Sequence, residues 1–207
     1  MSDSTVFVVD DDAAVRDALS LMLSLNGLRA SVFSSAEDFL AVYDPLWRGC
    51  LLTDLQMPGG MNGLELQDAL RAREIPLPVV VLTAHGDVAT TRAALKNGAV
   101  DFLEKPFEED MLIEVLRNAI RVDEERRRAD TERMDARARL GRLTPREWDV
   151  LEALADGLQH REVAERLSIS PRTVEVYKAR LLEKLQCRTL GRLVRIGIES
   201  RDLRPPA

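Results

Sequence analysis

The sequence predicts an α/β doubly wound five-stranded parallel sheet over residues 1–120, a charged helical linker over residues 121–141 and an all-α four-helix domain over residues 142–207. Strand-like and helix-like segments alternate five times in residues 1–120, which implies parallel strands joined by right-handed crossover helices. The apolar run "VVVL" is typical of a parallel strand that is covered on both faces. After Gly141, every segment has helical periodicity.

The five expected strands are short apolar segments, and the helices that follow them carry apolar residues at helical spacing. The first helix has Val15, Leu19 and Leu23 on one face and stops at Gly27, a residue favoured after helix C-termini. Ser35 is expected to cap the second helix. The strands are expected at residues 5–9, 28–33, 50–54, 77–84 and 100–107, and the helices at residues 14–27, 35–43, 62–73, 87–98 and from 108 onward.

The linker is rich in charge but not in helix breakers. From Arg121 to Arg142, 14 of 22 side chains are charged, there is no proline, and Gly141 is the one glycine. Acidic residues lie three or four positions from arginines, a spacing that stabilises a solvated helix. We therefore expect the preceding helix to continue to about Leu140, and a coiled-coil dimer seam is less favoured because apolar residues are sparse. Four short helices are expected next, at residues 144–157, 159–168, 170–186 and 189–200.

Composition limits the class of protein. Residues 1–120 carry 9 basic and 19 acidic side chains, whereas residues 143–207 carry 12 and 10, so the two parts are expected to have different partners. Cys50 and Cys187 have no CxxC motif or histidine cluster, which indicates small buried residues rather than a disulfide or a zinc site. No apolar run approaches the length of a membrane span and no signal peptide is evident, so we expect a cytoplasmic protein without a membrane partner.

Polar side chains stand at the ends of four expected strands. Asp10 and Asp11 end the first strand, Asp54 the third and Thr83 the fourth, and Lys105 follows the fifth. Ligands collect where the carboxyl ends of parallel strands meet. Several carboxylates in one crevice require protons or a shared cation, and Mg²⁺ (or Mn²⁺) is bound by a few such oxygens. With a hydroxyl and an ammonium for phosphoryl oxygens, the arrangement predicts an acyl phosphate on Asp54 as the nucleophile.

Each of these residues alone also has a structural explanation. The first-strand aspartates could cap the following helix, Thr83 could simply end a strand, and Lys105 could pair with a surface acid. Asp12 is interpreted as such a cap. We favour the phosphoryl site because its parts come together from four separate strand ends.

Four segments resemble the receiver domains of two-component response regulators, which have a flavodoxin-like fold: "VVDDD", "LLTDLQMPGGMNGLEL", "VVVLTAHGD" and "GAVDFLEKPF". The resemblance covers about residues 5–120 and implies that Asp54 accepts phosphate from a sensor histidine kinase. It further implies a metal site of Asp10, Asp11, Asp54 and the backbone carbonyl of Gln56, a phosphate contact from Lys105, and a switch pair of Thr83 and Phe102.

The loop after Asp54 departs from the receiver pattern. Gly59 and Gly60 both separate Pro58 from Met61, where receivers usually have a single residue. Glycine loses the most backbone freedom on ordering. The added residue therefore predicts a more flexible loop and an altered lifetime of the phosphorylated state, rather than lost activity.

The helix expected at residues 170–186 has a strong start, with Ser170 as N-cap and Pro171 at the first helical position. Val174, Tyr177 and Leu181 share one face and are expected to pack inward. The opposite face is small and basic, which suits the major groove of double-stranded DNA, although a plain solvated face is the alternative. The base-edge candidates are Arg172, Glu175, Val176, Ala179 and Arg180, and the phosphate-contact candidates are Thr173 and Lys178.

The segments "LTPREWDVL", "REVAERLSISPRTVEVYKARLLEKL" and "RTLGRLVRI" resemble the LuxR-type helix-turn-helix of the FixJ and NarL group of transcription regulators. The wording "TAHGD" and "DFLEKPF" is most similar to the FixJ branch. "QHRE" at residues 159–162 replaces the more usual "SNKE", and Trp148 stands where relatives often have a polar residue. His85 and His160 are interpreted as structural residues.

The two resemblances together imply a response regulator and DNA-binding transcription factor, with no enzymatic activity beyond self-catalysed phosphotransfer to, and dephosphorylation of, Asp54. Phosphorylation is expected to favour a homodimer that places two recognition helices on two half-sites, and RNA polymerase is a further candidate partner. Arg92 falls on the expected dimer surface, where relatives often carry an apolar residue, so the dimer could be polar or weak. One alternative is an aspartyl-phosphate phosphohydrolase, which would need DxDx[TV] where "DDDAA" stands. The other is DNA binding that does not depend on phosphorylation.

Overall fold

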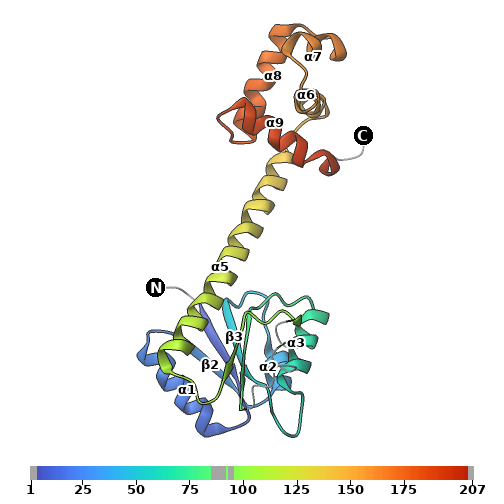
Figure 1. The fold of residues 1–207 in the computed structure, drawn as a ribbon. Coiled ribbons are helices and arrows are strands. Elements are labelled where there is room, and N and C mark those ends of the chain that lie inside the picture. The colour runs from blue at the N-terminus through green and yellow to red at the C-terminus, as the bar shows by residue number, and fades with distance from the viewer. Residues whose placement is uncertain (1–3, 85–91, 93–95, 205–207) are drawn as a thin grey trace. The chain divides into compact units, whose positions relative to one another are not determined.

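A computed structural model describes residues 4–84, 92 and 96–204. The chain divides into two compact units, Met1–Arg128 and Ala129–Ala207. The first unit contains β1 (Thr5–Val9), α1 (Ala13–Leu25), β2 (Arg29–Phe33), α2 (Ala36–Val42), β3 (Gly49–Asp54), α3 (Gly63–Ala72), β4 (Val79–Thr83) and β5 (Asp101–Glu104). Helix α5 (Glu109–Leu140) begins in the first unit and ends in the second (Figure 1).

The five strands form one parallel sheet in the order β2-β1-β3-β4-β5, which confirms the predicted fold class. Val9 pairs with Thr53, and Asp54 pairs with Leu82, so β1, β3 and β4 end at the same edge of the sheet. The chain winds in opposite directions from β1 and from β3. In sheets of this order, the crevice outside the carboxyl ends of those two strands is the usual binding position.

Alternate residues of the central strands enter two apolar layers. Val6 and Val8 pack with Leu23 of α1 and Leu116 of α5 on one face of the sheet. On the other face lies a second apolar layer, which includes Phe7 and Val9 of β1 and buried residues of α2 and α3. Figure 1 shows the two helix pairs on either side of the sheet. Both layers are needed because the central strands of a parallel sheet bury both of their faces.

An aromatic cluster lies between β1, β2 and α2, together with Trp47 just before β3. The ring of Phe7 stacks on that of Trp47, with 4.5 Å between the centroids and 9° between the planes. Phe33, Phe39 and Tyr43 surround this pair. These rings form part of the apolar layer between β1 and α2.

Some predicted bounds were wrong by a few residues. β4 covers Val79–Thr83 rather than residues 77–84, because Pro76 and Pro78 interrupt the extended segment and lack the N–H that a ladder needs. β5 ends at Glu104, two residues before Pro106. The helix expected at residues 87–98 falls largely outside the described residues, as does His85.

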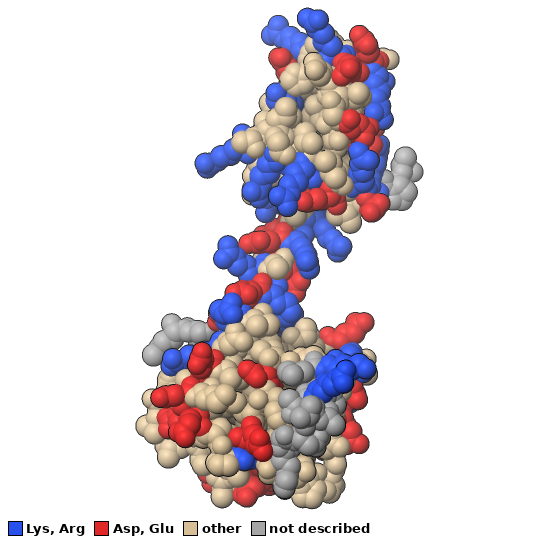
Figure 2. Space-filling view, viewed as in Figure 1, with Lys and Arg blue, Asp and Glu red and all other residues tan. Residues whose placement is uncertain are grey.

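Helix α5 is 32 residues long, which confirms the predicted continuation to Leu140. The N–H of Gly141 donates to the carbonyl of Arg137 and closes the last turn. Most side chains of α5 from residue 121 to residue 139 are exposed, and Figure 2 shows basic and acidic groups interspersed along this part of the helix. Asp123 is the notable exception, because it is fully buried.

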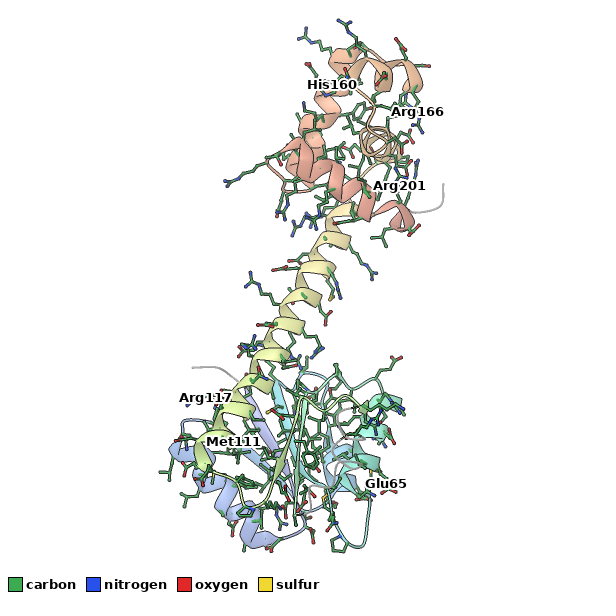
Figure 3. All side chains as sticks on the ribbon, in the orientation of Figure 1. Glu65, Met111, Arg117, His160, Arg166 and Arg201 are labelled. Atoms are coloured by element: carbon green, nitrogen blue, oxygen red, sulfur yellow. The ribbon has the colours of Figure 1, made fainter. Side chains whose placement is uncertain are left out.

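The second unit contains α6 (Pro145–Ala155), α7 (His160–Leu167), α8 (Pro171–Lys184), α9 (Leu190–Glu199) and the 3-10 turn η1 (Arg201–Leu203). Trp148 is buried in its apolar core. Cys187 is buried there too, as Cys50 is in the sheet, and both are free thiols as expected. Arg166 of α7 and Arg201 of η1 both pair with Asp156 at the end of α6, so Asp156 joins α7 and η1 to α6 (Figure 3). Among the helices that the structure describes, none combines the length and apolarity needed to cross a bilayer.

Candidate functional site

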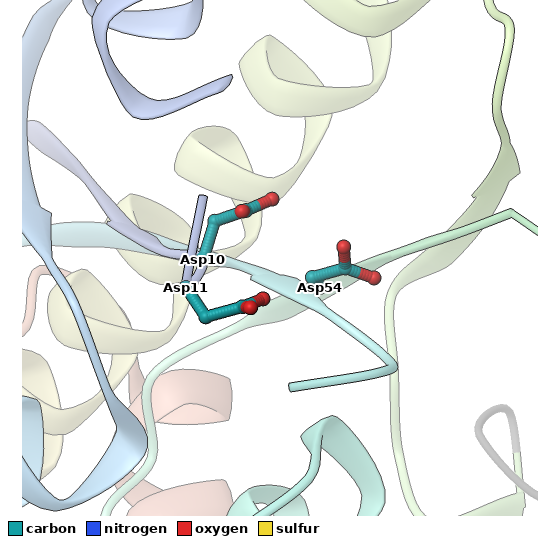
Figure 4. Close-up of side chains that lie close together, drawn as sticks. All are labelled: Asp10, Asp11 and Asp54. Atoms are coloured by element: carbon teal, nitrogen blue, oxygen red, sulfur yellow. The ribbon is translucent and has the colours of Figure 1, made fainter. Parts of the chain in front are cut away.

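Three carboxylates converge at the carboxyl ends of β1 and β3 (Figure 4). Asp10 and Asp11 follow β1, Asp54 ends β3, and one carboxylate oxygen of each lies within 4.8 Å of the others. Asp10 is 1% exposed, and its Oδ1 accepts the N–H of Asp12 at 2.9 Å. Asp12 caps α1 by accepting the N–H of Ala14 at 2.8 Å, as predicted. In the turn after β1, Asp12 therefore caps a helix, whereas Asp10 and Asp11 belong to the carboxylate cluster with Asp54.

Lys105 joins two of these carboxylates. Its Nζ lies 2.7 Å from Oδ2 of Asp54 and 3.2 Å from Oδ2 of Asp10. The backbone N–H of Lys105 donates to the carbonyl of Thr83 at 2.7 Å, which extends the ladder between β4 and β5 to the lysine itself. Sequence positions 10, 54 and 105 thus meet within the reach of one small ligand.

The local electrostatics follow from burial and charge. Burial of Asp10 raises the pKa of its carboxyl group, although the Asp12 N–H and the Lys105 ammonium oppose the rise. Burial of Lys105 works to lower its pKa, but the hydrogen bond and negative charge of Asp54, followed by the charge of Asp10, outweigh burial and raise that pKa. The lysine is therefore firmly cationic, and the cluster keeps a net negative charge for a further cation to neutralise.

The donor set fits Mg²⁺. The three carboxylates supply only hard oxygen ligands, which this ion prefers, and it needs only a few of them because it retains several waters. The backbone of Gln56 also reaches the site, since its N–H donates to Oδ1 of Asp54 at 3.2 Å. Receiver domains bind Mg²⁺ at an aspartate cluster of this kind. The role of the Gln56 carbonyl as a fourth ligand stays a prediction.

Thr83 and Phe102 lie on the neighbouring strands. Thr83 is fully buried at the end of β4, one residue beyond Leu82, the β-ladder partner of Asp54. Phe102 of β5 is partly buried against the apolar layer beneath α2 and α3. These positions are compatible with a switch pair, and their movement stays a prediction.

Two contacts at the site were not predicted. Nη1 of Arg16 donates to the carbonyl of Asp10 at 2.7 Å and so holds the turn after β1. Oε1 of Glu37, in the first turn of α2, accepts the N–H of Met61 at 2.8 Å in the loop after Asp54. Basic residues in a first helical turn and acidic residues near a helix cap are common on protein surfaces. The positions of Arg16 and Glu37 in the sequence therefore did not indicate that they contact the site.

The candidate nucleic-acid interface is the exposed face of α8. Ser170 caps this helix by accepting the N–H of Thr173 at 3.1 Å, and Pro171 occupies its first turn. Val174 and Leu181 are fully buried, which confirms the inward face. The residues expected to contact DNA lie on the rest of the helix surface. Five of them are exposed (Arg172, Glu175, Val176, Ala179 and Arg180) and two are half-buried (Thr173 and Lys178).

Local contacts orient two of the basic side chains. The guanidinium of Arg180 lies 6.0 Å from the ring centroid of Tyr177, within the range of a cation–π contact. Nζ of Lys178 lies 3.5 Å from Nε2 of His160, at the start of α7. This contact places the lysine of α8 beside the segment in which "QHRE" departs from the family pattern.

Comparison with known proteins agrees with both halves of this description. Residues 6–117 match the response regulator receiver domain, and residues 141–196 match the luxR family of bacterial regulatory proteins. The chain is 41% identical to the transcriptional regulatory protein FixJ of Bradyrhizobium diazoefficiens over 94% of this chain and 95% of that protein. It is 43% identical to FixJ of Rhizobium meliloti over 96% of this chain and 97% of that protein.

Solved structures show the same likeness. The response regulator StyR is similar with a TM-score of 0.84 and 38% identity, covering 96% of this chain and all of that one. Full-length FixJ from B. japonicum has a TM-score of 0.60 and 40% identity, covering 99% of this chain and all of that one. These families regulate transcription and are not metabolic enzymes, which sets the phosphohydrolase alternative aside. The chain therefore belongs to the FixJ-like response regulators of two-component systems, in which a receiver domain is joined to a LuxR-type DNA-binding domain.

Proposed function

We propose that this regulator is switched by phosphorylation of Asp54. The domain division that we propose is a receiver over residues 1–120, a helical linker over 121–141 and a DNA-binding domain over 142–207. The observation that carries the proposal is the position of Lys105, whose ammonium contacts both Asp54 and Asp10 at the carboxyl edge of the sheet. A lysine so placed can pass from a carboxylate to a phosphoryl oxygen without leaving the site.

The proposed chemistry is a phosphoryl transfer from the phosphohistidine of a sensor kinase. A carboxylate oxygen of Asp54 attacks phosphorus, the new O–P bond forms as the N–P bond breaks, and the imidazole of the kinase leaves with the bonding electron pair. Lys105 then contacts a phosphoryl oxygen. Asp10, Asp11, Asp54 and the carbonyl of Gln56 would hold Mg²⁺, which neutralises charge on the carboxylates and on the transferred group when it is bound.

The proposed response passes from the phosphoryl group to DNA. The hydroxyl of Thr83 moves toward the phosphoryl group and the ring of Phe102 turns inward, which changes the surface beside β5. That surface, with the exposed Arg92 on it, then forms a homodimer. Dimerisation places two α8 helices in successive major grooves, where Arg172 and its exposed neighbours read base edges. RNA polymerase is the further partner that we propose for the DNA-bound dimer.

Beryllofluoride, a stable stand-in for the phosphoryl group, tests this function in the full-length chain. Wild-type protein and an Asp54→Asn variant are compared with Mg²⁺ alone and with Mg²⁺ plus beryllofluoride. Mass is followed by light scattering, and affinity is measured for duplexes selected from random sequence. We expect only the wild type to dimerise and to bind DNA at least about tenfold more tightly. Equal mass and equal affinity in both conditions would instead support DNA binding that is independent of phosphorylation.

A further inference from the structure

The loop between β3 and α3 is tied down at both of its ends. The N–H of Gly63 donates to the carbonyl of Leu55 at 3.0 Å. The side chain of Asn62 accepts the N–H of Glu65 at 3.0 Å, and Oε2 of Glu65 accepts the N–H of Asn62 at 2.9 Å. Between these ends, Met57 is buried, whereas residues 58–60 are exposed. The middle of the loop therefore depends on contacts from elsewhere in the chain.

Glu37 supplies such a contact. Its Oε1 accepts the N–H of Met61 at 2.8 Å, across 24 positions of sequence. A Cβ built on Gly60 would lie 3.1 Å from both carboxylate oxygens of Glu37. The carboxylate thus lies directly against the glycine, and any larger residue at position 60 would press on it. The second glycine of this loop and the acid on α2 are complementary in shape.

We propose that Glu37 is a positioning residue for the phosphorylation site, which it serves by holding this glycine-containing loop in place; the inference rests on the proposed function above. Gly59 has a φ of +93°, a conformation open to glycine and costly for other residues, so two adjacent glycines leave the loop with many alternative conformations. Ordering them on binding would cost backbone entropy. The Glu37 contact removes part of that freedom beforehand, so that Gln56 and Asp54 are arranged for Mg²⁺ before it binds.

The test uses the full-length protein and two direct readouts. Calorimetric titration gives the affinity for Mg²⁺, and hydrogen exchange gives the protection of the Met61 amide. We expect Glu37→Ala to weaken Mg²⁺ binding about fivefold, the order of one hydrogen bond, and to speed exchange at Met61. Glu37→Gln keeps the Oε1 acceptor and is expected to remain within about twofold of the wild type.

A second pair of variants tests the same contact from the glycine side. Gly60→Ala places a methyl group 3.1 Å from the carboxylate oxygens, which must shift by a few tenths of an ångström, so it is expected to weaken Mg²⁺ binding less than Glu37→Ala does. Because both changes act on the same contact, the double variant should bind Mg²⁺ no more weakly than Glu37→Ala alone. Glu74→Ala, an exposed acid beyond the C-terminus of α3, is the matched control and should leave both readouts unchanged.

Three outcomes would overturn the inference. Mg²⁺ affinity and Met61 exchange could be unchanged in Glu37→Ala. Glu37→Gln could be as damaging as Glu37→Ala, which would assign the effect to charge. Glu37→Ala and Glu37→Gln could lower the thermal midpoint without changing Mg²⁺ affinity or Met61 exchange, which would indicate a purely structural role in α2. A wild type that binds neither Mg²⁺ nor beryllofluoride overturns the proposed function together with this inference, whereas a normal wild type with an unaltered Glu37→Ala variant overturns the inference alone.

Discussion

The carboxylate of Asp123 accepts the backbone N–H of Gly49 at 3.0 Å and so joins helix α5 to the first residue of β3. Arg126 and Arg127 pair with the same carboxylate at 2.6 and 2.8 Å. Gly49 has a φ of +126°, and a Cβ there would lie 1.9 Å from the carbonyl oxygen of Thr5, so the strand start has no room for a side chain. The strand that ends at Asp54 is thus attached at its other end to the helix that leaves the receiver.

This attachment predicts a large loss of stability when the acid is removed. Asp123→Ala removes the acceptor of the Gly49 N–H and the carboxylate that Arg126 and Arg127 share, so it should lower the free energy of unfolding by about 3 kcal/mol. Glu125→Ala is the matched control, because its pair with Arg121 is more than 60% exposed on both sides. It should change that free energy by about 0.5 kcal/mol or less. Urea unfolding followed by circular dichroism measures both, and equal losses would contradict the prediction.

Replacement of Lys105 should affect cation and anion binding in opposite directions. In Lys105→Met, the ammonium no longer competes for Asp10 and Asp54, so Mg²⁺ should bind at least about fivefold more tightly, the order expected from one nearby charge. Beryllofluoride should bind more weakly because its cationic contact is lost. Calorimetric titrations with each ligand test the two signs separately. Lys96→Met, which removes an exposed lysine, should leave both affinities unchanged, and tighter binding of both ligands by Lys105→Met would contradict the scheme.

Replacing Asp10, the buried acid after β1, by asparagine is expected to stabilise the fold at neutral pH but not at acidic pH. The pKa of Asp10 is raised by burial, so its ionised form opposes folding at neutral pH. A raised pKa contributes stability below the unfolded value and loses it as the pH rises through the folded value. In Mg²⁺-free solution, Asp10→Asn should therefore be more stable than the wild type at pH 7, and the difference should disappear near pH 3, where the acid is protonated. Thermal unfolding at both pH values checks this, and a less stable variant at pH 7 would contradict it.

The face of α8 predicts two kinds of DNA contact. Arg172→Ala should cost about 1–3 kcal/mol on the preferred sequence and relax the choice of one base, whereas Lys178→Ala should weaken all sequences alike and reduce the salt slope by about one. Fluorescence anisotropy at several salt concentrations distinguishes the two. Arg133→Ala, an exposed arginine of α5, removes the same charge without touching α8. If this control matched Lys178→Ala, the effect of Lys178 would come from general charge and not from a phosphate contact.

Much of the fold followed from local signals in the sequence. Periodic apolar residues located the helices, and the caps at Asp12, Ser35 and Ser170 each bind a backbone N–H two or three positions away. The convergence of Asp10 and Asp54 followed from parallel pairing, because strand ends of one sheet share an edge. Such features depend on chemistry within a few residues, or on a single rule of topology.

Other features depended on contacts between distant residues, which spacing does not reveal. Asp123 lies in a segment of alternating charge and is indistinguishable by pattern from its solvated neighbours, yet it is buried against β3. Glu37 has the appearance of an ordinary first-turn acid until Met61 is placed beside it. The surroundings of Trp148 could not be assigned either, because an aromatic residue at a usually polar position has no partner encoded nearby.

The two tryptophans of the chain are divided between the two units. Trp47 stacks on Phe7 beneath the sheet, and Trp148 is buried in the helical core. Each unit therefore carries one tryptophan, and replacing either by phenylalanine leaves a tryptophan emission signal that reports on the other unit alone. A phosphate analogue added at the aspartate cluster can then be followed optically, from the half that binds it to the half that reads DNA.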